Sequence, residues 1–264
     1  MCFPNIKNKL FNKISLSESC KAIILGSILG DGSLKLYKPY KNARFWIRHS
    51  LIQKEYWEWK VSQLSEIQTT QSKQIQKPMG FSKNKKLLFQ SSAKPELTQI
   101  YNILYKKNCL KIRRTWLNFM TPLSLAIWWL DDGSIIGNGK RGVFCTDCFS
   151  KEENKLLKNY LHTVWKIEVN IGTLKRTYKR GDEPKTQEIY RLYLNTTSLK
   201  KLFRLIMPSS PKLSSMIYKY CILYKDTELQ QRWISEMVNL FPSMKNTIIN
   251  TINKRKQKLK YFRK

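Results

Sequence analysis

The chain is short of acidic residues and of long apolar segments, and each shortage excludes a class of protein. Its 264 residues hold 18 Asp and Glu against 49 Lys and Arg, which gives a formal net charge of +31. So large an excess goes beyond what solubility needs and predicts a polyanionic partner. Charged residues interrupt every apolar run before the roughly 20 residues that a membrane span requires. Residues 1–19 lack the apolar core of a signal peptide. We therefore expect neither a membrane protein nor a secreted one.

Cysteines are also few, and their spacing predicts no disulfide framework. Six are present, at positions 2, 20, 109, 145, 148 and 221, and only Cys145 and Cys148 form a C-x-x-C pair. A structural zinc site needs a second pair of ligands. The chain has no second close cysteine pair and only two histidines, His49 and His162. Buried reduced thiols are therefore the better interpretation, and zinc is the minor alternative.

Two apolar stretches of helical length echo each other, residues 24–33 (ILGSILGDGS) and residues 125–134 (LAIWWLDDGS). Each ends in an acid, a glycine and a serine. The glycine suits the end of a helix, where a left-handed backbone without a side chain is favoured. A carboxylate there meets the negative end of the helix dipole and is unfavourable unless a cation joins it. Two acids, Asp31 and Asp132, at equivalent places in a repeat therefore predict shared metal binding.

The two stretches resemble the paired motifs of the LAGLIDADG homing endonucleases, and the Trp-rich second copy is most similar to the single-chain branch of that family. Gly26 and Gly32 match the glycines of the first copy, and Asp31 matches its final acid. Asp132-Gly133 matches the end of the second copy. The resemblance covers nearly all of residues 18–225.

Three positions depart from the family pattern. Leu29 and Leu130 replace an earlier consensus acid, which is not the metal ligand in the family, so this loss puts little in doubt. Ile127 stands where the second copy would have glycine, which predicts looser or differently packed motif helices.

The resemblance implies an α/β (α+β) protein of two pseudo-symmetric αββαββα halves, each with a saddle-shaped antiparallel sheet, with the motif helices packed side by side. It implies a monomer, since both motifs lie on one chain, that cleaves both strands of double-stranded DNA with Mg2+ (or Mn2+). Asp31 and Asp132 would bind the metal, because magnesium takes hard oxygen ligands. The carbonyls of Gly30 and Asp131, at the helix ends, are further candidate ligands.

The order of elements supports a true duplication. From Asp31 to Ser92 is 61 residues and from Asp132 to Thr197 is 65, and each span leads to the closing helix of its half. Counting a further 22 residues from Ser92 and Thr197 reaches Arg114 and Lys219. The family places a lysine at this point beside the metal site, so Lys219 matches in residue type. Arg114 departs, since arginine can stabilise charge but cannot act as a base. In a chain with 49 basic residues, however, two basic positions can also coincide by chance.

In the family, a polar side chain on the strand after each motif contacts the water network. The matching positions are near His49 in the first half and Asp147 in the second, where the family often has glutamine. Asp147 can equally be a cap for the helix expected from residue 151, and His49 has the same ambiguity before the helix expected from residue 53.

Alternating residues predict hairpins whose basic and aromatic face suits phosphates and bases. In the first, over residues 34–38 and 44–49, four apolar side chains are expected to point one way: Leu34, Leu36, Phe45 and Ile47. We expect helices over residues 53–64, 95–107, 151–165 and 198–207, with strands over 73–77, 85–91, 168–179 and 187–195. The predicted DNA-binding residues are Lys35, Tyr37, Arg44, Trp46, Arg48, Lys73, Lys86, Gln90, Lys140, Arg141, Lys175, Lys179, Arg191 and Tyr193. A charged strand face is often merely solvated, and this alternative applies to each of them.

We expect the two halves to span residues 18–117 and 118–225, after an extension over 1–17 and before a C-terminal helix and basic tail over 226–264. The richness in Lys, Asn and Ile favours an organelle, a mitochondrion or chloroplast. Two other functions remain open: an intron maturase that binds intron RNA, and a plain DNA-binding repressor descended from a nuclease. Salt-sensitive binding would not separate DNA from RNA. The presence of both motif acids, Asp31 and Asp132, favours the nuclease.

Overall fold

The computed structural model describes residues 11–77, 84–179 and 184–262. It divides into two compact units, Met1–Asp131 and Asp132–Lys264. Both units contain strands and helices, so the α/β fold class is confirmed. None of the helices in the described ranges is both long and apolar enough to cross a membrane.

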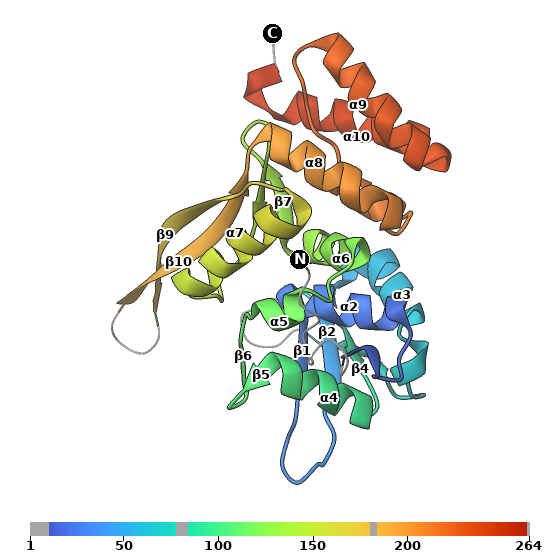
Figure 1. The fold of residues 1–264 in the computed structure, drawn as a ribbon. Helices are drawn as coiled ribbons and strands as arrows, with labels where there is room; N and C mark the ends of the chain where they lie inside the picture. The colour runs from blue at the N-terminus through green and yellow to red at the C-terminus, as the bar shows by residue number, and fades with distance from the viewer. Residues whose placement is uncertain (1–10, 78–83, 180–183, 263–264) are drawn as a thin grey trace. The chain divides into compact units, whose positions relative to one another are not determined.

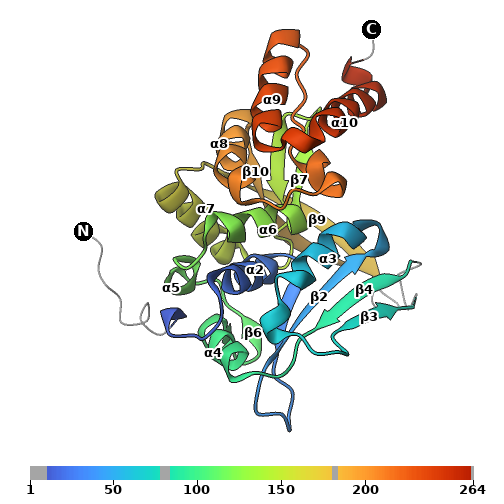
Figure 2. The same ribbon diagram turned by 90° about the vertical axis from the view of Figure 1, so that its right-hand side faces the viewer.

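The first unit repeats the predicted order of helix, hairpin, helix, hairpin and helix. Its four-stranded antiparallel sheet has the order β1-β2-β4-β3, and helices α3 and α4 pack against it (Figure 2). The elements are α2 (Glu18–Leu29), β1 (Gly32–Lys35), β2 (Arg44–Ser50), η1 (Leu51–Gln53), α3 (Lys54–Ser62), η2 (Ser65–Ile67), β3 (Lys73–Gln76), β4 (Lys86–Gln90), α4 (Pro95–Leu104), β5 (Tyr105–Lys106), β6 (Cys109–Leu110), α5 (Arg114–Leu117) and α6 (Pro122–Asp132).

The core of the first unit lies between this sheet and its helices. Leu34, Phe45 and Ile47 alternate along β1 and β2 and are at most 2% exposed, as their spacing predicts. Removing such side chains from water is the main favourable contribution to folding. The closing helix α4 stops at Leu104 instead of residue 107. Lys107 and Asn108 take left-handed backbone angles, and this turn joins the short strands β5 and β6.

The two motif helices, α2 and α6, pack directly against each other. A Cβ atom on Gly26 would lie 2.4 Å from the carbonyl oxygen of Ser124 and 2.7 Å from the Cβ of Ile127. Ile127 therefore does not loosen the contact, because Gly26 leaves room for it. The left-handed glycine predicted after each motif is wrong, since the positive-φ glycines of the described ranges are Gly137 and Gly139. Gly32 is needed instead because its backbone lies close to Ser27: a Cβ atom added to Gly32 would lie 2.7 Å from the Cβ of Ser27.

The second unit repeats the hairpin, helix, hairpin and helix that follow the motif, with sheet order β7-β8-β10-β9, whereas the second motif helix α6 belongs to the first unit. Helices α7 and α8 pack against this sheet, and α7 lies along the long β9–β10 ribbon (Figure 1). The helix α7 begins with a capping box formed by Ser150 and Glu153. The elements are β7 (Gly133–Ile136), β8 (Arg141–Phe144), α7 (Lys151–Trp165), β9 (Asn170–Lys179), β10 (Pro184–Leu194), α8 (Thr196–Ile206), η3 (Met207–Ser209), η4 (Ser214–Lys219), α9 (Thr227–Leu240), η5 (Pro242–Met244), α10 (Lys245–Lys258) and η6 (Lys260–Phe262).

The C-terminal segment differs from the single helix and tail that we predicted. It forms two helices, α9 and α10, and the basic run Asn253–Lys258 belongs to α10. Trp233 and Met237 of α9 and Ile248 of α10 are at most 1% exposed, so both helices pack into the second unit. Basic residues in the last turn of α10 suit its negative end.

Candidate functional site

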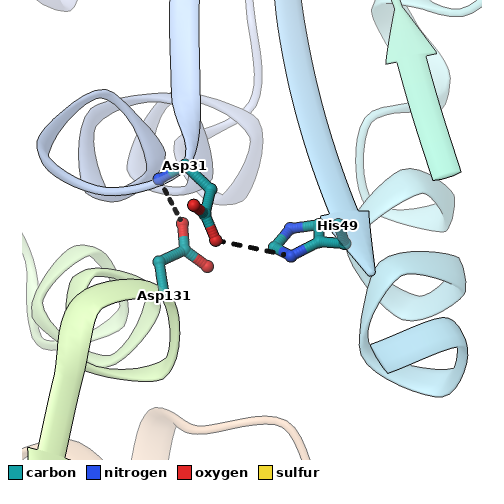
Figure 3. A group of neighbouring side chains, drawn as sticks. All are labelled: Asp31, His49 and Asp131. Atoms are coloured by element: carbon teal, nitrogen blue, oxygen red, sulfur yellow. Dashed lines mark hydrogen bonds and ion pairs between the residues drawn. The ribbon is translucent and has the colours of Figure 1, made fainter. Parts of the chain in front are cut away.

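Asp31 lies directly after the C-cap of the first motif helix, between α2 and β1. Its side chain is 39% exposed, so a ligand can reach the carboxylate. Its backbone N–H donates to Oδ2 of Asp131 over 3.3 Å. Asp31, His49 and Asp131 lie together in Figure 3, and their ligand atoms are within 4.8 Å of one another.

His49 stands on the helix-covered face of β2 because it continues the alternation of Phe45 and Ile47. It is 2% exposed. Its Nδ1 lies 3.5 Å from Oδ2 of Asp31 and 3.3 Å from Oε1 of Gln53, and both of these oxygens can accept a hydrogen bond. The ring therefore faces the motif acid, whereas the contact with a water network that the resemblance implies stays a prediction.

Lys60 explains which nitrogen of His49 carries the proton. Its ammonium lies 2.8 Å from each carboxylate oxygen of Asp131 and 3.4 Å from Nε2 of His49. A lysine ammonium can only donate, so Nε2 of His49 must accept. The proton then resides on Nδ1, where it points at the oxygens of Asp31 and Gln53. Lys60 thus sets the tautomer of the histidine beside the motif acid.

The ion pair between Lys60 and Asp131 is fully buried, with both side chains 0% exposed. The hydroxyl of Tyr56 also donates to Oδ1 of Asp131 over 2.8 Å. Lys60 lies on the buried side of α3, and its charged end is buried together with its aliphatic stem. Such a pair is stable only when further hydrogen bonds complete it, and Tyr56 and His49 supply them.

These contacts decide how a metal ion could fit. Both oxygens of Asp131 already face a cation, so an ion there would have to displace Lys60. The accessible carboxylate of Asp31 and the carbonyl of Gly30 are the hard oxygen donors that suit a partly hydrated Mg2+ or Mn2+. The donor set therefore fits the ion, provided that the Asp131 side chain is left out. Our prediction for Asp131 concerned its carbonyl and stays a prediction.

In the second unit, the end of the second motif lies beside a lysine. Asp132 is half-buried and its carbonyl accepts a hydrogen bond from the N–H of Cys145 over 3.0 Å. Lys219, from η4, is 7% exposed, and its ammonium donates to the carbonyl oxygen of Gly133 over 2.7 Å. The residue count from the duplication therefore leads to a lysine that touches the motif end.

Arg114, the matching position of the first half, is placed differently. It begins α5, and its Nε donates to Oδ1 of Asn118 over 2.7 Å. The neighbouring Arg113 donates to the carbonyl of Ile103 over 2.6 Å. The count therefore reaches an arginine that bonds within its own helical turn.

Asp147, the counterpart of His49, is bound by Arg191 of β10. The guanidinium makes two bonds to the carboxylate, of 2.6 and 2.7 Å. This hydrogen-bonded pairing lowers the pKa of Asp147, opposed in part by burial, and a nearby Arg176 acts in the same direction as Arg191. The alternative role of Asp147 as the cap of α7 is wrong, because Ser150 is the N-cap.

Strand register brings most of the predicted DNA-binding residues of the first half onto one face. Lys35 pairs with Arg44, and Trp46 pairs with Gln90, so these side chains share a face. The Lys35 ammonium lies 5.2 Å from the centre of the Trp46 ring. A cavity of about 350 Å³ opens beside Arg44 and Gln90. Arg48 and Lys86 belong to the same face by alternation, and Tyr37, 51% exposed, follows β1.

The other predicted DNA-binding residues do not all lie on one face of their sheet. Lys73 pairs with Phe89, which is on the helix-covered face of the first sheet. Lys175 pairs with Glu188, on the same face of the sheet as the buried Leu192. Arg141, Arg191 and Tyr193 lie on the opposite face. Lys179 ends β9, and Lys140 lies in the β7–β8 turn with its ammonium 5.4 Å from the Tyr261 ring centre. Alternation along β9 would have favoured Arg176 over Lys175.

The cysteines do not form a metal site in the described ranges. Cys145 and Cys148 are free, and the group of His, Cys, Asp and Glu side chains found there that could hold an ion is the one around Asp31. Burial raises the pKa of the Cys148 thiol to about 11, so that it stays protonated at neutral pH. The C-x-x-C pair is therefore reduced, but the prediction that its thiols are buried is wrong, because Cys148 is exposed and Cys145 is half-buried.

Comparison with known proteins places this chain in a family. A model described as the LAGLIDADG DNA endonuclease family matches residues 21–202, which include both motifs. The chain belongs to that family. The two stretches that end at Asp31-Gly32 and Asp132-Gly133 both lie within the matched residues.

Curated relatives of this LAGLIDADG chain carry two kinds of name. The cytochrome b mRNA maturase bI2 of Saccharomyces cerevisiae is 30% identical over 229 residues, which cover 81% of this chain and 51% of that protein. The protein RecA of Mycobacterium gastri is 30% identical over 172 residues, which cover 59% of this chain and 39% of that protein. The chain thus spans about half, or less, of these relatives' lengths.

The solved structure of the homing endonuclease I-WcaI bound to its DNA recognition sequence has a similar fold. Its TM-score is 0.63 at 21% identity, and the match covers 83% of this chain and 94% of that one. The LAGLIDADG fold predicted from the sequence is thereby confirmed.

Proposed function

We propose that this chain is a site-specific DNA endonuclease that makes a double-strand break in a long asymmetric target and so promotes intron mobility. The observation that carries the proposal is the duplicated end of the motif helices, where each half presents an acid directly before Gly32 or Gly133. Family membership and the similarity to an endonuclease described as bound to its DNA recognition sequence support it.

In this proposal, Asp31 and Asp132 hold Mg2+ or Mn2+, with the carbonyls of Gly30 and Asp131 as further donors. A divalent ion bound there would supply an activated water and stabilise charge on the phosphate oxygens. Asp31 is suited to the task because its carboxylate is exposed while the Nδ1 of His49 faces it. A histidine N–H held by second contacts fixes the orientation of the carboxylate that it meets.

The basic side chains would have two roles, stabilising charge on the reacting phosphate and binding the DNA. Lys219, beside the carbonyl of Gly133, would stabilise the charge that develops on the phosphate. Arg114 would do so less, because its Nε is bound to Asn118. The sheet-face residues around Arg44, Trp46 and Arg191 would bind the DNA backbone and bases, and phosphate contacts would supply most of the affinity.

We further propose that the protein acts as a monomer, in halves of residues 18–117 and 118–225, in an organelle. Both motifs on one chain support the monomer. The Lys, Asn and Ile bias of an AT-rich genome and the relative named for cytochrome b mRNA support the organelle, a mitochondrion or chloroplast.

A second candidate function is that of an intron maturase, which binds its own intron RNA and assists splicing with or without DNA cleavage. The maturase named among the relatives aligns over 81% of this chain and favours it. The excess positive charge suits RNA as well as DNA.

The test is incubation of the purified chain with a randomised DNA library in Mg2+, in Mn2+ and in EDTA. The nuclease proposal expects double-strand cuts at one sequence that depend on the metal. Tight DNA binding without any cut in either metal would contradict it. Splicing of the encoding intron, with and without the protein, would then test the maturase.

A further inference from the structure

A basic groove in the second unit contains Lys219 but none of the other catalytic, metal-binding or DNA-binding residues proposed above. It is a cavity of about 410 Å³ between β7, η4 and α10. Four cationic side chains line it, and no Asp or Glu does so in the part of the chain that the structure describes. The lining residues are Ser134, Ile135, Tyr218, Lys219, Thr251, Lys254, Arg255 and Lys258.

The fold holds Arg255 in this groove with backbone contacts. Its Nη1 donates to the carbonyls of Tyr218 and Cys221 over 2.9 and 3.0 Å. No carboxylate pairs with Arg255 within the described ranges. A guanidinium that is fixed by neutral groups and surrounded by other cations keeps its charge available for an anion.

The groove continues beyond a single anion site. A second cavity, of about 250 Å³, shares Ile135, Arg255 and Lys258 with the first and follows the β7–β8 turn to Leu259. Lys254 and Lys258 are four residues apart and therefore project from the same side of α10. Both are exposed. An elongated row of cations fits a chain of phosphates better than one isolated ion.

Lys219 ties the groove to the end of the second motif, because its ammonium touches the carbonyl of Gly133. We propose that α10 and η4 form a binding site for the phosphodiester backbone of duplex DNA, with Lys254, Arg255 and Lys258 as its contacts. The identity of the polyanion as DNA rests on the proposed nuclease function. The site would extend the DNA interface from the sheet to the C-terminal helices.

The test measures binding of a fluorescein-labelled DNA duplex of arbitrary sequence in EDTA by fluorescence anisotropy, over a series of salt concentrations. The test variant is Lys254→Gln with Lys258→Gln. The control is Lys201→Gln with Lys245→Gln, which removes the same charge from exposed positions of the same unit that do not line the groove. Circular dichroism checks that both variants keep the fold.

We expect the test variant to bind about tenfold more weakly and its slope of log K against log salt to become shallower by about 1 to 2, since each lost phosphate contact contributes about 0.9. The control should change the slope by less than half as much. Equal slopes for the two variants would overturn the inference, and so would a loss confined to an RNA duplex of the same length.

Binding in EDTA separates this inference from the nuclease proposal. If the test variant has the shallower slope but the protein never cuts DNA, the groove inference is supported and the nuclease proposal is contradicted. If the protein cuts DNA with a metal but the slope of the test variant is unchanged, the nuclease proposal is supported and the groove inference is contradicted.

Discussion

The two halves share a backbone plan but hold their buried polar groups in different ways. Both place a hairpin after the motif, and both order the four strands alike. Beside the first motif acid, α3 supplies a fully buried Lys60, and His49 faces Asp31. Beside the second, η4 supplies Lys219, while Asp147 is paired with Arg191. The duplication thus sets the positions of the two motif acids, whereas the polar side chains around each acid differ between the halves.

The largest expected effect comes from breaking the buried pair of the first half. Lys60→Met leaves the Asp131 carboxylate buried and unmatched, which costs about 3–5 kcal/mol of the free energy of unfolding. Urea denaturation measures it. Lys54→Met is the control on the same helix, since its pair with Glu58 is exposed and is worth at most about 1 kcal/mol.

A double variant sharpens that result. Lys60→Met combined with Asp131→Asn should be more stable than Lys60→Met alone, because the unmatched charge is gone. If Lys60→Met costs no more than Lys54→Met, the pair is not the buried support that we describe.

The next largest effect on stability concerns the contact between the motif helices, where α2 has Gly26 and α6 has Ile127. Gly26→Ala would bring a Cβ to 2.4 Å from the Ser124 carbonyl and 2.7 Å from the Ile127 Cβ. We expect a loss of about 1–3 kcal/mol on denaturation despite the better helix propensity of alanine. A variant as stable as the parent would show that the helices are not in close contact here.

A smaller effect compares the basic residues that the duplication aligns. Lys219→Met should slow DNA cleavage at least about tenfold, or about 1.4 kcal/mol in the barrier, because its ammonium lies at the motif end. Arg114→Gln should slow it less than about threefold, since its Nε is bound to Asn118. Single-turnover rates at saturating protein measure both. Equal losses would mean that the halves use these residues alike.

The smallest effect is a pH dependence confined to the second half. Arg191 holds the pKa of Asp147 below its ordinary value of 3.8. A lowered carboxyl pKa stabilises the fold above the ordinary pKa, and this contribution is lost as the pH falls through the folded value. Asp147→Asn should therefore cost about 0.5–1 kcal/mol near neutral pH.

This difference from the parent should shrink below pH 3.8 in urea titrations at several pH values. A difference that stays constant down to the most acidic stable condition would contradict the pairing.

The sequence predicts the duplicated fold well because its information is local. Alternation along residues 34–49 places Phe45 and Ile47 in the core, and α7 begins at residue 151 as predicted, although its cap is Ser150 and not Asp147. The acids at the ends of the motifs follow from the repeat itself.

The surroundings of the acids could not be predicted, because they depend on contacts between distant segments. Lys60 occupies an apolar position of its helix, which could have indicated a buried acid partner, but its spacing does not identify Asp131. Strand register, which separates Lys73 and Lys175 from the other basic residues, is likewise set by tertiary pairing. The second C-terminal helix was missed because α10 is rich in lysine and its buried stripe has few residues.

The most direct test of the central claim is cleavage of the mapped target, with each strand labelled at its end, by the parent, Asp31→Asn and Asp132→Asn. We expect metal-dependent double-strand cutting by the parent and none by either variant, while both variants still bind the DNA. Undiminished double-strand cutting by either variant would show that the two acids are not the paired metal ligands of the enzyme.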